Sequence, residues 1–143
     1  MTIAAILKSK GARVVGVPPT ATVREVVAML AAERIGAVPV LDDHGAVVGI
    51  FSERDVIGCI HARGAAALNG PVAEAMTAPA ITVAPDQPVI AALSLMTRRR
   101  IRHLPVVADG ALVGFISIGD LVKYRIDRIE ADADAMRAYI QSA

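Results

Sequence analysis

Two stretches of the chain carry apolar residues at the three- and four-residue spacing of an amphipathic helix. The positions are Val23, Val26, Val27 and Leu30 in the first stretch and Val89, Ala92, Leu93 and Met96 in the second. This spacing places the apolar side chains on one face, so each stretch predicts a helix with one buried side. Thr20 or Thr22 is expected to cap the first helix and Asp86 the second, because short side-chain oxygens accept hydrogen bonds from the free N–H groups at a helix start.

Short apolar runs predict the strands that accompany these helices. They lie at residues 37–41 and 47–51 after the first helix and at residues 103–107 and 112–116 after the second. Asp43-His44-Gly45 and Asp109-Gly110 separate the runs, and a turn containing Gly between two apolar runs predicts a hairpin. A further short strand is predicted before each helix, at residues 13–17 and 80–83. With a second helix beginning after Ser52 and after Ser117, the predicted order is β-α-β-β-α, twice.

An internal repeat accounts for this doubling. With an offset of 66 positions, 8 of the 27 residues from 17 to 43 are identical to their counterparts. With an offset of 65, after one residue is lost in the turn, 6 of the 13 residues from 45 to 57 are identical. A single register with one small gap indicates two copies of one structural unit. We therefore divide the chain at residues 1–66 and 67–143, which together form one domain.

The segments outside the repeat are also predictable in outline. Residues 64–71 resemble a linker, and residues 72–76 predict a short helix that leads into the second copy. Residues 118–139 predict one long helix with near-helical apolar spacing at Val122, Ile126, Ile129, Met136 and Ile140. Because this helix runs past its own repeat, we expect it to pack on the N-terminal segment (Ile3, Ile6, Leu7) or on another subunit.

The amino-acid composition limits the kinds of ligand, partner and cellular location that we expect for the chain. Hydrophobic residues make up 55% of the chain but aromatic residues only 3%, so a planar ligand would lie against aliphatic side chains. The net charge of +1 does not favour binding to nucleic acid or to an anionic membrane surface. Cys59 is the single cysteine and excludes an internal disulfide, which favours a cytoplasmic location. No apolar run approaches the length of a membrane helix, and Lys8 and Lys10 follow the short N-terminal apolar run, unlike a secretion signal.

The sharpest shared motif is Gly-x-x-Ser-x-x-Asp, at residues 49–55 and again at residues 114–120. In both copies a strand ends, a hydroxyl residue opens a helix, and a carboxylate follows three positions later. The motif, together with residues 100–107 and Met76-Thr77, resembles the cystathionine-β-synthase (CBS) domain family over roughly residues 13–124. This resemblance implies an α+β fold in which two tandem repeats pack sheet to sheet with pseudo-two-fold symmetry. It also implies that two such pairs associate as a homodimer, and that clefts between the repeats bind an adenine nucleotide such as AMP, ATP or NADH.

The resemblance carries over to particular residues. In the first copy it assigns Ser52 and Asp55 to ribose or phosphate and the stretch Ala37, Val38, Pro39 to adenine. The second copy would use Ser117, Asp120 and the stretch His103, Leu104, Pro105, with Thr82 on the entering strand. These residue types suit a nucleotide, because a carboxylate can accept two hydrogen bonds from a vicinal diol and a helix N-terminus offers N–H groups to phosphate.

Several of these residues also have an ordinary structural interpretation. Ser-x-x-Asp at the start of a helix is a capping box. The cluster Arg98–Arg100 with Arg102 suits either a helix C-terminus or bidentate phosphate contacts from Arg100 and Arg102. His103 could pack in the core or contact a ligand, and Lys10 could be a surface charge or approach a phosphate. Glu53 and Arg54 occur only in the first motif, so the two sites need not be equivalent.

The sequence contains no recognisable catalytic constellation and no metal-ligand spacing. We therefore expect a non-catalytic regulatory module that binds an adenine nucleotide and acts in signal transduction on a regulated protein that the sequence does not identify. The alternative is a dimerising scaffold that needs no ligand. A membrane or nucleic-acid partner is not expected.

Overall fold

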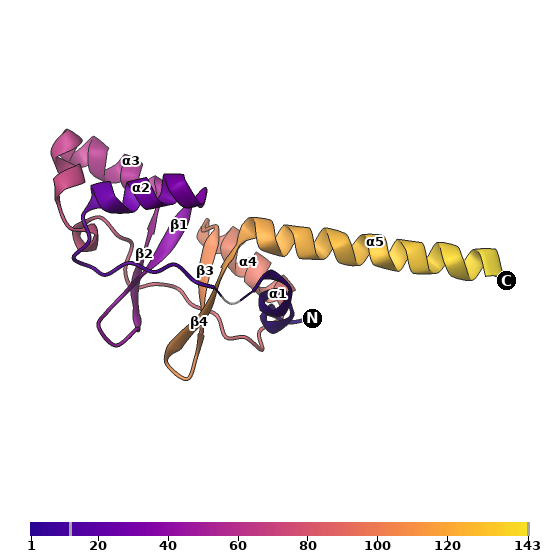
Figure 1. The fold of residues 1–143 in the computed structure, drawn as a ribbon. Coiled ribbons are helices and arrows are strands. Elements are labelled where there is room, and N and C mark those ends of the chain that lie inside the picture. Colours follow the sequence, from indigo (N-terminus) through magenta and orange to yellow (C-terminus); the bar gives the residue numbers. More distant parts are fainter. Residues whose placement is uncertain (12, 143) are drawn as a thin grey trace.

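The computed structural model describes residues 1–11 and 13–142, and Figure 1 shows its elements. In chain order they are α1 (Ile3–Lys10), α2 (Val23–Glu33), β1 (Ala37–Leu41), β2 (Val47–Ser52), α3 (Glu53–Arg63), the 3₁₀ helices η1 (Gly64–Asn69) and η2 (Val72–Glu74), α4 (Val89–Arg99), β3 (His103–Ala108), β4 (Ala111–Ser117) and α5 (Ile118–Ser142). The predicted α+β fold of two tandem repeats is confirmed.

Two antiparallel hairpins form the sheets, β1 with β2 and β3 with β4. Their registers correspond, since Ala37 lies opposite Ser52 in the first hairpin and His103 lies opposite Ser117 in the second. The turns need backbone with positive φ, which Gly45 supplies at 79° and Asp109 and Gly110 supply at 51° and 78°. This register places the start of β1 or β3 beside the helix that follows β2 or β4.

The short strands predicted before each helix are not formed, which corrects the sequence analysis. Residues 13–17 and 80–83 do not form strands, and only Val17 and Val83 make isolated parallel bridges, to Val40 and Val106. The Val17 N–H donates to the Pro39 carbonyl at 3.1 Å, and the Leu41 N–H donates to the Val17 carbonyl at 2.9 Å. Pro18 follows directly and has no N–H to continue the ladder.

The cap predicted for the first helix of each repeat is present in the first repeat only. Thr22 caps α2, because its side chain accepts from the Glu25 N–H and the Glu25 side chain accepts from the Thr22 N–H. Asp86 does not cap α4, which is a second correction. That helix begins at Val89 behind Pro88, too far along the chain for Asp86 to reach its first N–H groups.

The connection between the repeats is more ordered than a linker. Residues 64–69 form η1, whose Ala67 is buried against the first core, and the short helix predicted at residues 72–76 is the 3₁₀ turn η2. The Val72 N–H donates to the Ala21 carbonyl at 2.7 Å and the Val23 N–H donates to the Gly70 carbonyl at 2.9 Å. This connection is therefore anchored to the start of α2.

The chain builds two hydrophobic cores, and each takes a segment from outside its own repeat. The first core contains Val23, Val38 and Phe51 of the first repeat together with Ala67 and Val72. The second core is composed of Val83, Val89, Ala92, Met96, Leu104, Val106, Ile116 and Leu121 together with Ile3 and Ile6 of α1. Packing thus crosses the expected boundary between residues 66 and 67 in both directions, and that boundary stays a prediction about the sequence repeat.

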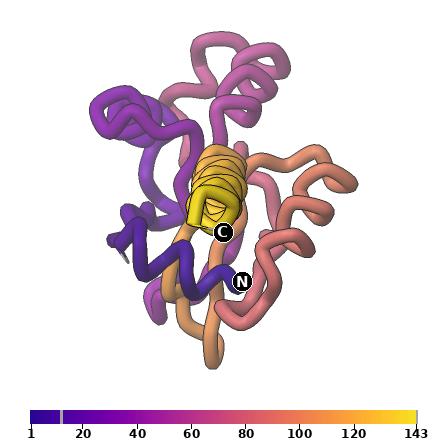
Figure 2. The backbone as a smooth tube through the Cα atoms, turned by 90° about the vertical axis from the view of Figure 1, so that its right-hand side faces the viewer, coloured from indigo at the N-terminus to yellow at the C-terminus, as the bar shows by residue number. Residues whose placement is uncertain are grey.

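The long helix α5 leaves the body of the molecule after its first two turns (Figure 1). Leu121 is buried and Tyr124 packs against the second core near α1, with the Tyr124 hydroxyl 3.6 Å from the Met1 sulfur. The expected packing of this helix on the N-terminal segment is confirmed for these turns. All residues from 125 to 142 are exposed, and Figure 2 views the projecting helix from its C-terminal end.

The dependence of the second core on α1 can be tested with Ile3→Ala. Ile3 is fully buried in that core, so we expect the variant to lose about 2–5 kcal/mol of unfolding free energy. Ile90→Ala is the matched control, because Ile90 lies on α4 but is 65% exposed, and we expect a change within about 0.5 kcal/mol. Urea denaturation measures both, and equal effects of the two substitutions would contradict the packing.

Candidate functional site

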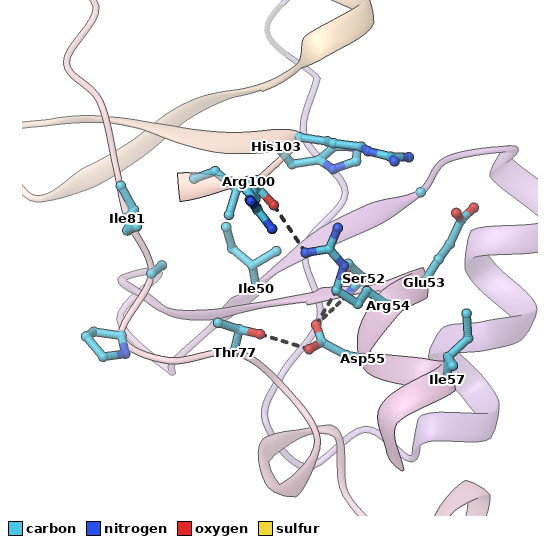
Figure 3. A pocket seen from close by; sticks show the side chains of 15 residues that line it. Ile50, Ser52, Glu53, Arg54, Asp55, Ile57, Thr77, Ile81, Arg100 and His103 are labelled. Carbon is cyan, nitrogen blue, oxygen red and sulfur yellow. Dashed lines mark hydrogen bonds between the residues drawn. The ribbon is translucent and has the colours of Figure 1, made fainter. Parts of the chain in front are cut away.

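Two cavities of about 440 Å³ each lie where the repeats meet. This volume is within the usual range of small-molecule sites. The first cavity contains the first Ser-x-x-Asp motif and is lined by Gly36, Ile50, Ser52, Glu53, Arg54, Asp55, Ile57, Thr77, Pro79, Ala80, Ile81, Arg100, Ile101, Arg102 and His103. Figure 3 shows how these side chains are arranged.

The Asp55 carboxylate lies at the N-terminus of α3 within the first cavity. One oxygen, Oδ2, accepts from the Ser52 N–H at 2.9 Å and lies 3.1 Å from the Ser52 hydroxyl. The other, Oδ1, accepts from the Thr77 hydroxyl at 2.8 Å (Figure 3). The bond from the Ser52 N–H caps the helix, as the structural interpretation predicted. Each carboxylate oxygen offers about two acceptor sites, so Asp55 retains capacity to bind a ligand.

Arginine side chains from both repeats meet at the first cavity. The Arg54 guanidinium donates to the Arg100 carbonyl at 3.2 Å, which joins α3 to the end of α4. The two interpretations of the arginine cluster apply to different members. Arg98 and Arg99 belong to the last turn of α4, whereas Arg100 and Arg102 line the cavity. Arg100 caps α4 with left-handed backbone at φ 55°, which turns the chain toward β3 and the cavity.

The second cavity contains the second motif and the end of α1. It is lined by Lys10, Arg13, Val14, Val15, Glu33, Arg34, Ile35, Gly36, Ala37, His103, Phe115, Ser117 and Asp120. The Lys10 ammonium donates to Asp120 Oδ2 at 2.6 Å and to the Phe115 carbonyl at 2.8 Å. Asp120 Oδ2 also accepts from the Ser117 N–H at 2.8 Å, and the Asp120 N–H donates to the Ser117 hydroxyl at 3.1 Å. Asp120 is therefore both a helix cap and the partner of a lysine.

The structure groups the predicted site residues differently from the sequence assignment. Asp55 shares its cavity with His103 and not with the stretch 37–39, while Asp120 shares its cavity with Ala37. His103 lines both cavities. Each cavity therefore takes residues from both repeats, whereas the sequence assignment paired each motif with the apolar stretch of its own hairpin.

Five predicted residues line neither of the two cavities. They are Val38, Pro39, Thr82, Leu104 and Pro105. The Val38 and Leu104 side chains are buried in the first and second cores, and Pro39 and Pro105 are buried within their strands. Thr82 is exposed. Strands β1 and β3 are covered along most of their length, so only their first residues reach a cavity.

Sequence reasoning missed the segments that cross between the repeats. Residues 77–81 contribute Thr77, Pro79, Ala80 and Ile81 to the first cavity, and residues 13–15 line the second. Thr77 was available as a signal, since Met76-Thr77 belongs to the family resemblance, but its hydrogen bond to Asp55 was not predictable. The side chains of Ile50, Ile57 and Ile81 supply the aliphatic wall that the low aromatic content requires.

Electrostatics distinguish His103 and Asp120 in the second cavity. Burial lowers the pKa of His103 below 6.5, and the Lys10 charge lowers it further against the opposing effect of Asp120. The ring is therefore neutral at pH 7 and stacks on Phe115 with centroids 5.6 Å apart. Burial alone would raise the pKa of Asp120, but hydrogen bonds from Lys10 and Ser117 and the Lys10 charge hold it below the ordinary value.

Other candidate chemistry is sparse in the part of the chain that the structure describes. Cys59 is buried and its thiol donates to the Val56 carbonyl at 3.3 Å. Among residues 1–11 and 13–142, no group of His, Cys, Asp and Glu side chains is placed to hold a metal ion. Within the same residues, no helix combines the length and apolar character needed to cross a membrane.

Comparisons with known proteins agree with the doubled motif. The family model "CBS domain" matches residues 9–62 and again residues 72–127. The mitochondrial CBS domain-containing protein CBSX3 of Arabidopsis thaliana is 34% identical over 148 residues, which cover 98% of this chain and 72% of that protein. A CBS-domain containing protein from Agrobacterium tumefaciens has a crystal structure similar to this one, with 40% identity, a TM-score of 0.83, and coverage of 87% of this chain and 92% of that chain.

A third similar protein has a bound nucleotide. It is a CBS domain protein from Pyrobaculum aerophilum complexed with AMP, 34% identical, with a TM-score of 0.75. The similarity covers 84% of this chain and 89% of that one.

The influence of Lys10 on His103 can be measured by NMR titration. We expect His103 to titrate with a midpoint below 6.5, and Lys10→Gln to raise that midpoint because it removes a nearby positive charge and leaves Asp120 to favour the imidazolium. Lys8→Gln is the matched control, since Lys8 is exposed on the same helix and lines neither cavity. A midpoint unchanged by Lys10→Gln would contradict the contact between α1 and Asp120.

Proposed function

Because this chain belongs to the CBS domain family, we propose that it is a non-catalytic regulatory module that binds an adenine nucleotide between its two repeats. The observation that carries the proposal is the first cavity, which Ser52 and Asp55 of one repeat line together with Arg100 and Arg102 of the other. A ligand in this position would contact both repeats.

The groups that line the first cavity match the parts of a nucleotide. Asp55 can accept hydrogen bonds from a ribose diol. Arg100 and Arg102, with Arg54, can bind phosphate in the bidentate geometry that guanidinium groups favour. Ile50, Ile57 and Ile81 offer an aliphatic surface to the base. The AMP complex of the Pyrobaculum aerophilum relative supports this proposal, and AMP is therefore the first ligand to test, ahead of ATP and NADH.

The second cavity is proposed to bind a nucleotide more weakly. Asp120 already pairs with Lys10 at 2.6 Å, so a ribose diol would have to compete with an ammonium group for the carboxylate. Asp55 has only neutral donors, from Ser52 and Thr77. Lys10 in the second cavity is therefore a further reason to expect unequal sites, beside Glu53 and Arg54 in the first.

An interaction module without a ligand is the second candidate function. The exposed apolar residues of α5, from Val122 to Ile140, favour it. A partner on α5 would occupy a different surface from a nucleotide in the cavities, so nucleotide binding alone would not exclude an interaction through α5. We infer a homodimer and a cytoplasmic location in either case, and a regulated protein as the recipient of the signal.

A thermal-shift panel with AMP, ADP, ATP, NAD⁺, NADH and S-adenosylmethionine tests the proposed function. A ligand at about 100 times its Kd should stabilise the protein by about 2.7 kcal/mol, which raises Tm by about 5–10 °C at this chain length. We expect AMP to give a clear shift. A flat panel from folded protein that carries no co-purified nucleotide would overturn the proposal and favour the ligand-free module.

The role of Asp55 is tested with Asp55→Asn and two ligands. We expect the wild-type protein to bind AMP about 10- to 100-fold more tightly than 2′-deoxy-AMP, because a hydrogen bond to a charged group is lost. In Asp55→Asn this preference should shrink, and Asp120→Asn should change it less because the second cavity is the weaker site. Isothermal titration calorimetry gives the affinities. A preference that survives unchanged in Asp55→Asn would refute the assignment of this carboxylate.

Phosphate binding is tested with Arg102→Gln. We expect this variant to weaken AMP binding by about 10-fold or more while adenosine binding changes little, because a charge-assisted bond to phosphate is removed. Arg99→Gln is the matched control, since Arg99 lies in the same cluster but lines neither cavity. Calorimetry with both ligands separates the phosphate contribution from any general weakening. Equal losses for AMP and adenosine would contradict the assignment.

A further inference from the structure

The exposed part of α5 carries one continuous apolar stripe, which we call the α5 seam. It consists of Val122, Ile126, Ile129, Ala133, Met136 and Ile140. These positions alternate four and three residues apart without a break, which is the heptad pattern of a coiled coil. The ordinary helix period of 3.6 would drift around the helix over this length, whereas a strict 3.5 repeat keeps the stripe facing a partner helix.

Within residues 1–11 and 13–142, no other element covers the α5 seam beyond its first turn. Leu121 and Tyr124 are the residues of α5 that pack against the second core. On a helix with about 100° per residue, the seam is centred roughly 130° around the helix from that pair. Ile126, Ile129, Met136 and Ile140 are each about half exposed or more. The seam therefore begins where the contact with the body ends, and it points away from the body.

We propose that α5 pairs with α5 of a second copy of this chain as a parallel, in-register, two-stranded coiled coil. The seam residues take the inner positions a (Ile126, Ala133, Ile140) and d (Val122, Ile129, Met136). Pairing about a two-fold axis brings the same stripe of both copies together, which is the geometry of a closed homodimer. The proposal goes beyond the nucleotide site and uses none of its residues.

Charged residues beside the α5 seam favour a second copy of this chain as the partner and a parallel orientation of the two helices. In a parallel dimer each g position faces the e position five residues further along the other helix. Arg125 then faces Glu130 of the second copy, and Asp132 faces Arg137 of the second copy. Symmetry doubles both pairs, so all four contacts join opposite charges. Arg137 pairs with Asp134 of the same helix at 3.3 Å on the exposed surface, and such a pair contributes little and can be exchanged.

The antiparallel alternative places like charges together. A full-length antiparallel overlap sets e beside e and g beside g. It would bring Lys123 against Arg137, Glu130 against Glu130 and Asp132 against Asp132 of the second copy. Like charges in these positions are destabilising. The same charges that favour the parallel pair therefore disfavour its reverse.

Cysteine cross-linking of the full-length protein tests the arrangement. Ile129→Cys and Met136→Cys, made separately, should each form an intermolecular disulfide under mild oxidation, because a d residue meets the same residue of the second copy. In any antiparallel register at least one of these two pairs would be about 10 Å or more apart along the helix axis, beyond the reach of a disulfide. Ala138→Cys is the control, since its f position faces outward in the dimer.

The outcomes separate this proposal from the others. Cross-linking of both d variants at a mass of twice the 14.9 kDa chain, with none from Ala138→Cys, is the expected result. Cross-linking of only one d variant would overturn the parallel register, and none would overturn the pairing. A native mass above that of a dimer, measured by light scattering on the same protein, would overturn the two-stranded state. Cys59 is buried, so the unmodified protein should not cross-link. A nucleotide panel without shifts leaves this test unaffected.

Charge reversal gives a second, independent test. Glu130→Arg places Arg125 against an arginine of the second copy and should slow disulfide formation in the Met136→Cys background. Adding Arg125→Glu exchanges the two charges and should restore the rate. If Glu130→Arg leaves the rate of disulfide formation unchanged, or adding Arg125→Glu does not restore that rate, the proposed ion pairs do not exist.

Discussion

Each hydrophobic core of this protein is completed by a segment that comes from outside its own repeat. Helix α1 supplies Ile3 and Ile6 to the second core, and the connection after α3 supplies Ala67 and Val72 to the first. The chain must therefore pass from one core to the other twice, once after α1 and once after Met76. Both passages run along the junction of the repeats, and they line the two cavities. The sites exist where they do because the cores exchange segments.

The same exchange makes the two Ser-x-x-Asp motifs unequal. Both carboxylates cap a helix, but the third partner comes from the passing segment in each case. Asp55 accepts a hydrogen bond from the neutral Thr77 hydroxyl. Asp120 instead forms an ion pair with the Lys10 ammonium at the end of α1. The two motifs thus differ in their surroundings as well as in the residues between Ser and Asp. The pKa of His103, lowered by burial and by Lys10, belongs to the same arrangement.

Periodicity was sufficient to predict most of the fold, and it failed where contacts are not local. The strands at residues 37–41 and 103–107 and the doubled order follow from patterns a few residues long. The entering strands were wrong because prolines after Val17 and near Val83 limit the ladder to single bridges. The cavities combine residues of both repeats, whereas the sequence suggested that each motif would use its own hairpin. Arg100 and Arg102 were predicted as candidates, but only the packing of the repeats brings them to the same cavity as Asp55.

Helix α5 begins at the second cavity and extends far from it. A helix of 25 residues is about 37 Å long, and only its first turns are fixed to the body. Asp120 lies within the first of those turns. A tilt of about 5° at that end displaces the other by about 3 Å. Because the Lys10 and Asp120 pair lies at the fixed end of α5, a small tilt of the helix at this pair would become a displacement of several ångströms at the C-terminal end.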